Sequence, residues 1–139
     1  GYTDKWNTEE DTITISEGGN SCGYVNLITS RFWSGGHCYS VNELKDNTLN
    51  NFLFQYLKFN ELLIMRLRVG SGLPNIQKKD IDSFKVDLPH IVEQGKISNL
   101  LTLADDDLEK LKQELVVLKT QKKGLMQKLL TGQVRVTIN

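Results

Sequence analysis

The first part of the chain carries short apolar segments separated by glycines. Residues 12–16 (Thr-Ile-Thr-Ile-Ser) alternate polar and apolar side chains, and Gly18-Gly19-Asn20 follows them. This alternation predicts a strand that ends in a turn. Further short strands are predicted where apolar runs stand between turn residues, at residues 22–27, 37–41, 62–69 and 84–88.

One helix is predicted between these strands. Apolar residues follow Leu49 at offsets of 3, 4, 7 and 8, which places them on one side of a helix. Asp46 or Asn47 is the expected cap at its start. Several strands with a helix on one face predict an α+β domain with a compact mixed sheet.

The second part of the chain has a different period. From residue 97 onward, ten positions are separated alternately by four and three residues, and nine of them are apolar. This is a heptad pattern, which is typical of a coiled coil. The expected helix-pairing residues are Ile97, Leu101, Ala104, Leu108, Leu111, Leu115, Leu118, Lys122, Leu125 and Leu129.

This helix is predicted to pair with a second long helix. Its apolar seam extends for about 50 Å at 1.5 Å per residue, which exceeds the width of a domain of about 90 residues. Acidic residues 105–107 and 109 come early, whereas every charged residue after Glu114 is basic. Antiparallel pairing would place acidic beside basic side chains, so the expected partner helix is antiparallel.

Composition divides the chain near Pro89. All 11 aromatic residues, both prolines and eight of the 11 glycines precede residue 91. We therefore expect a compact domain over residues 1–90 with a shortened N-terminal part, a helix over 91–132 and a tail over 133–139. The chain begins at Gly1 and carries no signal or membrane-spanning pattern, so the expectation is a fragment or processed chain in the cytoplasm.

Charge and cysteine content narrow the possible functions. The 17 basic and 17 acidic side chains balance, so the composition is not that of a polybasic nucleic-acid binder. Partner proteins in a complex can still supply the positive potential that attracts DNA. Cys22 and Cys38, with His37 and His90, match no zinc-ligand spacing, and no metal site is expected. No phosphate-binding loop or methyltransferase motif occurs, so the chain is expected to be non-catalytic and to hold no cofactor.

Several stretches together resemble the specificity subunit of type I restriction–modification enzymes. The strongest are Gly70-Ser71-Gly72-Leu73-Pro74-Asn75-Ile76, residues 81–89, Glu93-Gln94 with Ile97, and residues 124–132; residues 20–25 and Phe32-Trp33 are similar to parts of its target recognition domains. That subunit normally has two such domains and two antiparallel spacer helices. This chain has room for one of each, as in a half subunit or a C-terminal fragment.

The resemblance implies partners as well as a function. Each recognition domain would contact one half of a bipartite site in double-stranded DNA, and the helix would scaffold the modification subunits. S-adenosylmethionine, ATP and magnesium would belong to the modification and motor (restriction) subunits. A coiled-coil oligomerisation or scaffold protein with a protein-binding N-terminal domain is the alternative, mildly favoured by the zero net charge.

Candidate DNA-contacting side chains lie in polar loops of the first part. Direct contact with bases requires polar side chains on protruding segments, and phosphate contact requires cations. Turn formation explains Asn20 and Ser21 equally well. Ion pairing or a surface position is the favoured explanation of Arg31, a structural role that of His37, and solvation that of the two lysines, so the prediction concerns the region. The candidates are Asn20, Ser21, Arg31, His37, Ser71, Asn75, Lys78 and Lys79.

Overall fold

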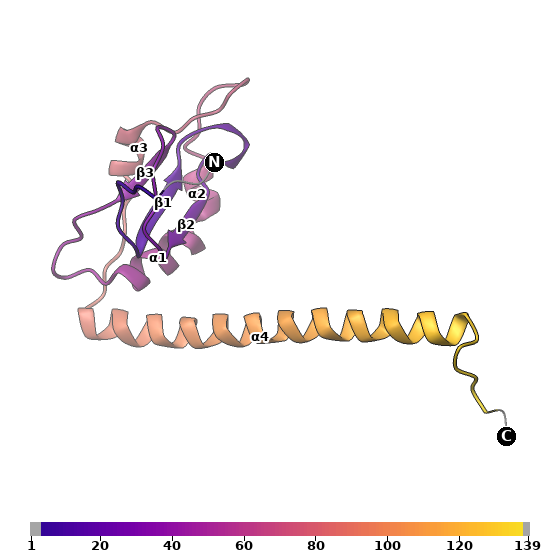
Figure 1. Cartoon of the computed structure of the whole chain (residues 1–139). Helices are drawn as coiled ribbons and strands as arrows, with labels where there is room; N and C mark the ends of the chain where they lie inside the picture. The colour runs from indigo at the N-terminus through magenta and orange to yellow at the C-terminus, as the bar shows by residue number, and fades with distance from the viewer. Residues whose placement is uncertain (1–3, 138–139) are drawn as a thin grey trace. The chain divides into compact units, whose positions relative to one another are not determined.

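The structure, a computed structural model, describes residues 4–137 and divides the chain into two compact units, residues 1–99 and 100–139. The first unit combines a small sheet with helices, and a long helix, α4 (Ile91–Leu130), begins in it and continues through the second (Figure 1). The α+β class with a long C-terminal helix is therefore confirmed. Among the described residues, no helix has the length and apolarity needed to cross a membrane.

The sheet has three strands, with β1 (Thr12–Ser16) in the centre. β2 (Val25–Ile28) and β3 (Cys38–Val41) pair with its two edges in the order β2-β1-β3, and both pairings are antiparallel. Ile13 stands opposite Leu27 on one side and Val41 on the other. The sheet is thus antiparallel throughout and not mixed.

Two of the predicted strands are wrong. Residues 61–65 form helix α2 (Glu61–Met65), and residues 84–88 carry no strand. The run Leu62-Leu63-Ile64 is apolar at consecutive positions, and such a short run does not distinguish a strand from a helix. The Asn60 carbonyl accepts the N–H groups of Leu63 and Ile64, which starts a helical turn. A further short helix, α3 (Lys78–Asp82), precedes residues 84–88.

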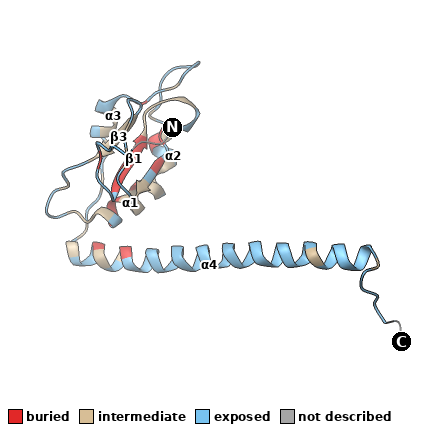
Figure 2. Ribbon diagram, in the orientation of Figure 1, coloured by how far each residue is buried: buried red, intermediate tan, exposed pale blue. Residues whose placement is uncertain are grey.

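The core lies between the sheet and α1 (Asn50–Phe59). Figure 2 shows the buried residues of this unit on the strands and on parts of the helices, with none on α3. Each fully buried aliphatic side chain stabilises the fold by about 1.5–3 kcal/mol. The buried cluster comprises Ile13, Ile15, Cys22, Val25, Leu53, Leu57, Ile64 and Ile76.

The start of α1 is held by a residue that is remote in sequence. Leu49 is its N-cap residue, and no side chain of the preceding residues caps the helix, so the expected cap at Asp46 or Asn47 is wrong. Gln94, on the first turn of α4, is fully buried, and its Oε1 accepts the Leu49 N–H at 2.9 Å. Its Nε2 donates to the carbonyls of Asn47 and Pro89, both at 2.8 Å. A buried amide therefore replaces the local cap.

The second unit is the remainder of α4 and the residues that end it. Gly132 adopts a left-handed conformation, with φ of 74°. The N–H of Gly132 donates to the Leu129 carbonyl, and the N–H of Val134 donates to the Lys128 carbonyl. A left-handed glycine with such bonds is a common helix end, because it satisfies the last carbonyl groups.

Candidate nucleic-acid interface

Three loop segments meet where β1 ends, at residues 17–21, 36–37 and 69–76; we call them the loop cluster. The Glu17 N–H donates to the His37 carbonyl at 3.0 Å, and the Ile76 N–H donates to the Glu17 carbonyl at 2.9 Å. The Gly19 N–H donates to the Pro74 carbonyl, also at 2.9 Å. Main-chain bonds therefore join segments that are far apart in the sequence.

The loop cluster contains five of the eight predicted DNA-contacting residues, all of them exposed: Asn20, Ser21, His37, Ser71 and Asn75. Lys78 and Lys79 follow directly on α3 and are also exposed. Arg31 has other partners. Its Nε lies 2.8 Å from Glu9 Oε2, and its guanidinium lies 5.0 Å from the centre of a Trp6 ring.

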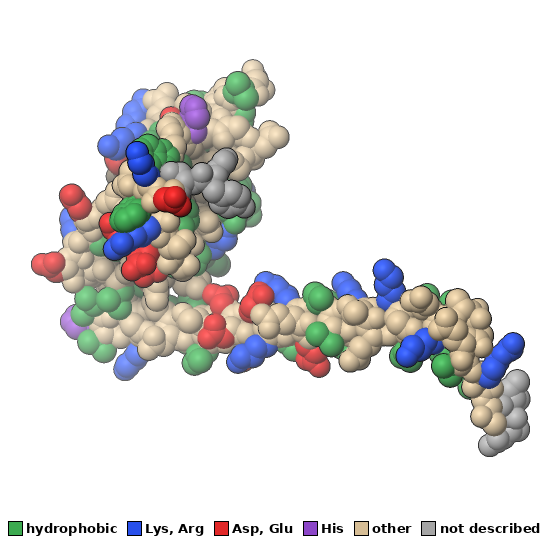
Figure 3. Space-filling view, viewed as in Figure 1, with side chains coloured by type: hydrophobic (Ala, Val, Ile, Leu, Met, Phe, Trp, Pro, Cys, Tyr) green, Lys and Arg blue, Asp and Glu red, His purple; other side chains and the backbone are tan. Residues whose placement is uncertain are grey.

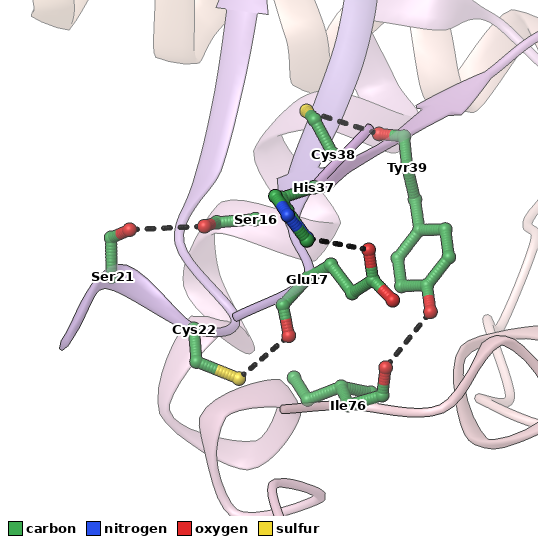
Figure 4. Close-up of polar contacts among 8 residues, drawn as sticks. All are labelled: Ser16, Glu17, Ser21, Cys22, His37, Cys38, Tyr39 and Ile76. Atoms are coloured by element: carbon green, nitrogen blue, oxygen red, sulfur yellow. Dashed lines mark hydrogen bonds and ion pairs between the residues drawn. The ribbon is translucent and has the colours of Figure 1, made fainter. Parts of the chain in front are cut away.

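Glu17 lies at the centre of the polar contacts beneath these exposed side chains (Figure 4). Its carboxylate Oε2 is 3.7 Å from His37 Nδ1, and the His37 side chain is 93% exposed. The Glu17 carbonyl accepts from Cys22 Sγ at 3.1 Å. Glu17 thus contacts a buried thiol through its main-chain carbonyl and an exposed imidazole through its carboxylate.

Tyr39 and Cys22 lie beneath the same cluster and have perturbed acidities. The Tyr39 hydroxyl donates to the Ile76 carbonyl at 2.9 Å. Burial raises the pKa of Tyr39, and the negative charge of Glu17 adds to the effect. Burial also raises the pKa of the Cys22 thiol. Both groups are held in their neutral forms, which suits packing under a surface.

The loop at residues 69–75 is closed at its base. Val69 and Asn75 exchange two main-chain hydrogen bonds, of 2.8 and 3.0 Å. Gly70 has a φ of 99°, a conformation that residues with a side chain rarely adopt, and it turns the chain away from this base. Leu73, near the tip, is 87% exposed.

Sequence reasoning missed two cations next to this loop, Arg66 and Arg68, which are both exposed. The signal that could have found them is the charge pattern, since residues 62–79 contain four basic side chains and no acidic one. Among residues 4–137, no group of three His, Cys, Asp or Glu side chains is placed to hold a metal ion.

The helix-pairing positions lie on α4. Nine of the ten, from Leu101 to Leu129, are exposed, and Ile97 is half-buried (Figure 2). Leu118, Lys122, Leu125 and Leu129 line a shallow, mostly apolar groove along the helix surface. Figure 3 shows the acidic side chains of α4 gathered in its earlier part, with basic ones extending beyond them.

Comparison with known proteins identifies the family. Residues 1–123 match the family described as the type I restriction modification DNA specificity domain. The chain belongs to this family. The match covers the sheet, the loop cluster and most of α4.

Two relatives of this family member come from an archaeon and a mycoplasma. A Methanocaldococcus jannaschii protein, provisionally named the MjaX type I specificity subunit, is 33% identical over 114 residues, which is 82% of this chain and 27% of the relative. A provisionally named type I specificity subunit of Mycoplasma genitalium is 34% identical over 113 residues, which is 80% of this chain and 29% of the relative. The chain spans less than a third of the length of either relative.

A solved structure shares the fold. The crystal structure of a type I restriction–modification S subunit from M. genitalium is similar with a TM-score of 0.71 and 29% sequence identity. The similarity covers 92% of this chain and 34% of the S subunit. The sheet domain and the long helix are therefore features that this family member shares with a specificity subunit.

Proposed function

We propose that this chain acts as a DNA-recognition part of a type I specificity subunit. Its first unit contacts one half of a bipartite site in duplex DNA. The observation that carries the proposal is the family match over residues 1–123, which includes both the loop cluster and most of α4. The proposal assigns no reaction to the chain itself.

The loop cluster and the start of α3 supply the groups that such contact requires. Asn20, Ser21 and Asn75 offer amide and hydroxyl groups, which can donate to and accept from the edges of bases. Lys78 and Lys79 offer cations to phosphates, and these set the register of a protein on the duplex. The side chains are exposed while the main chain beneath them is fixed, so contact with DNA does not require refolding.

The exposed seam of α4 supports a second role, in assembly. Leucines at heptad spacing are normally buried against another helix. The proposed partner is an antiparallel helix, from a second copy or from another part of a longer subunit. The helix pair would scaffold modification subunits, which would bind S-adenosylmethionine, and a motor subunit, which would bind ATP and magnesium.

Selection from a random duplex library tests this function. The chain is purified with a type I modification subunit, and bound duplexes are recovered and sequenced. We expect enrichment of one short motif, or of two inverted copies of that motif at a fixed spacing where two chains pair through α4. The matched control replaces Asn20 and Asn75 with alanine and is expected to lose enrichment while it still binds the modification subunit. Recovery of no enriched motif would contradict the proposal.

A scaffold protein with a protein-binding first unit is the alternative. Phe59 at 88% exposure, with Leu62 and Leu63 nearby on α2, forms an exposed apolar patch that favours it. The same selection separates the two functions. A scaffold protein would bind the modification subunit and return the input library unchanged.

A further inference from the structure

The loop between Val69 and Asn75 combines a fixed base with an open tip. Two main-chain bonds close the base, and the Gly19 N–H holds the Pro74 carbonyl from the side. A Cβ added at Gly72 would meet no atom within 4 Å, so the tip stands clear of the rest of the molecule. Leu73 is therefore presented on a loop whose base is closed by main-chain hydrogen bonds.

The side chains around this loop give it a distinct charge. The segment of residues 62–79 has a net charge of +4, in a chain whose net charge is zero. In the sequence, two cations precede the loop and two follow it: Arg66, Arg68, Lys78 and Lys79. Among residues 4–137, none of these flanking cations forms an ion pair, whereas Arg31 and Lys58 do. The acidic residues next to this segment in the sequence are Glu61, which pairs with Lys58, and Asp80 and Asp82 of α3. Glu17 faces His37.

A single exposed leucine is ordinary on a protein surface. Its position between unpaired cations on a closed loop is what requires explanation. Several DNA-binding proteins insert a leucine or another apolar side chain between adjacent base pairs, while cations hold the phosphates on either side. The inserted residue must protrude, and its support must be rigid enough to separate stacked bases.

We propose that Leu73 is such a wedge, and that the flanking cations bind the phosphates beside the step that it opens. The proposal deepens the proposed function and rests on it, because it requires that the first unit contacts duplex DNA. The wedge contributes affinity for deformable DNA independently of base identity. Sequence discrimination then falls to the polar residues of the loop cluster.

The charge around the loop favours DNA over another occupant. A protein partner would more naturally bury the exposed side chains of Phe59 and Leu62, which together offer more apolar area than Leu73 alone. A membrane surface would also attract cations, but stable insertion takes more apolar area than one leucine supplies. Binding to vesicles of anionic lipid is therefore an outcome that the experiment must distinguish.

A mismatch assay tests the wedge with the full chain. Affinity at low salt is measured by fluorescence anisotropy for a fully paired duplex and for the same duplex with one central mismatch. A mismatch lowers the work of unstacking, so the parent chain is expected to bind the mismatched duplex about 5-fold more tightly. Leu73→Ala should bind both duplexes equally. Leu62→Ala, a second exposed leucine outside the loop, should retain the preference.

The flanking cations are tested through salt dependence. The double variant Arg68→Gln/Lys79→Gln should reduce the slope of log K against log salt by about 1.8, because each phosphate that a cation neutralises contributes about 0.9 to that slope. The matched control, Lys45→Gln/Lys85→Gln, removes the same charge from exposed sites outside the loop and should leave the slope unchanged. Thermal unfolding of every variant confirms that the fold is retained.

Each outcome is decisive. An unchanged mismatch preference in Leu73→Ala, or none in the parent chain, overturns the wedge. If motif selection still succeeds in that case, the proposed function stands without it. A loss of vesicle binding in Leu73→Ala with DNA binding unchanged assigns the loop to membranes and overturns the inference. A parent chain that binds no DNA, alone or with a modification subunit, overturns both.

Discussion

Gln94 Oε1 lies 2.9 Å from the main-chain nitrogen of Leu49, across 45 residues of sequence. The same amide donates to two carbonyls, those of Asn47 and Pro89, so all of its bonds are made to main-chain groups. One side chain therefore fixes the start of α1 and the first turn of α4 together. Within the motif Glu93-Gln94, Gln94 has a structural role in the first unit.

We expect Gln94→Ala to lower the free energy of unfolding of the first unit by about 2–4 kcal/mol. It leaves one N–H and two carbonyl groups without their partner, and unsatisfied buried groups cost about 1–3 kcal/mol each before relaxation. Urea unfolding measures the change. Gln113→Ala, at an exposed position of α4, is the control and should change it by less than about 0.5 kcal/mol. Equal stabilities would contradict the anchoring role.

Gly23→Ala should be strongly destabilising. Gly23 has a φ of 87°, and an added Cβ would lie 2.8 Å from Met65 Cα. Backbone strain and this close approach together should cost about 2–4 kcal/mol in thermal or urea unfolding. Gly36→Ala is the control, because a Cβ there meets open space. A stable Gly23→Ala variant would mean that α2 can move away from this turn.

Alkaline pH should weaken the first unit through Tyr39. Its pKa is raised from the usual 10.0, chiefly by burial, so the folded state resists ionisation that the unfolded chain undergoes. The associated stability is present below pH 10 and is lost as the pH rises through the folded-state pKa. Tyr39→Phe should show a smaller loss between pH 8 and pH 11 in urea unfolding. An equal loss in both proteins would assign the effect to other groups.

If α4 meets a copy of itself, the antiparallel register should place Leu111 opposite Leu115 and Ala104 opposite Lys122. The Lys122 stem can then lie over the small Ala104 side chain. Oxidation should join a Leu111→Cys chain to a Leu115→Cys chain in preference to two Leu111→Cys chains. Preferential joining of two Leu111→Cys chains would indicate parallel helices.

In the same assembly, Leu111→Ala should destabilise the paired state by about 2–5 kcal/mol, because it opens a cavity in a buried layer. Analytical ultracentrifugation measures the dissociation constant of the paired state and thus the effect. Gln113→Ala, on the side of the helix away from the seam, should leave the association unchanged. Unchanged association in both variants would place Leu111 outside the interface.

The chain alone should bind DNA weakly. Residues 1–90 carry 9 basic and 11 acidic side chains, so few phosphate contacts are available. A dissociation constant of about 10⁻⁴–10⁻⁶ M near physiological salt is expected, weakening further as salt is added. Anisotropy titrations measure it. Nanomolar, salt-resistant binding of the isolated chain would contradict the charge argument.

The spacing of apolar residues predicted the elements in which that spacing is regular. Residues 12–16 alternate because they form a strand, and the heptad spacing after Ile97 marks a helix. The strand predicted from Leu62 onward was wrong because consecutive apolar residues show neither the two-residue period of a strand nor the 3.6-residue period of a helix. The anchoring role of Gln94 could not be predicted, since it depends on main-chain groups 45 residues away.

The candidate interface was predicted residue by residue but not as an arrangement. Glu17 and His37 lie close because β1 pairs with β3, and the pair of Ser16 with Cys38 directly adjoins them. Pro74 and Ile76 join this segment through main-chain bonds, which leave no trace in side-chain patterns. Arg31 could not be separated from the others by sequence, because its pairing with Glu9 is a tertiary contact.

The hydrogen bonds described for the loop at residues 69–75 all join main-chain atoms, at Val69, Asn75, Pro74 and Gly19. The conformation of the loop base therefore depends little on which side chains stand at the tip. Substitutions at Ser71 or Leu73 are therefore expected to leave the domain folded, and a substitution at the polar Ser71 can change binding preference in a single step. For protein engineering, the loop is a natural graft site, where libraries of tip sequences can be exchanged on an unaltered support.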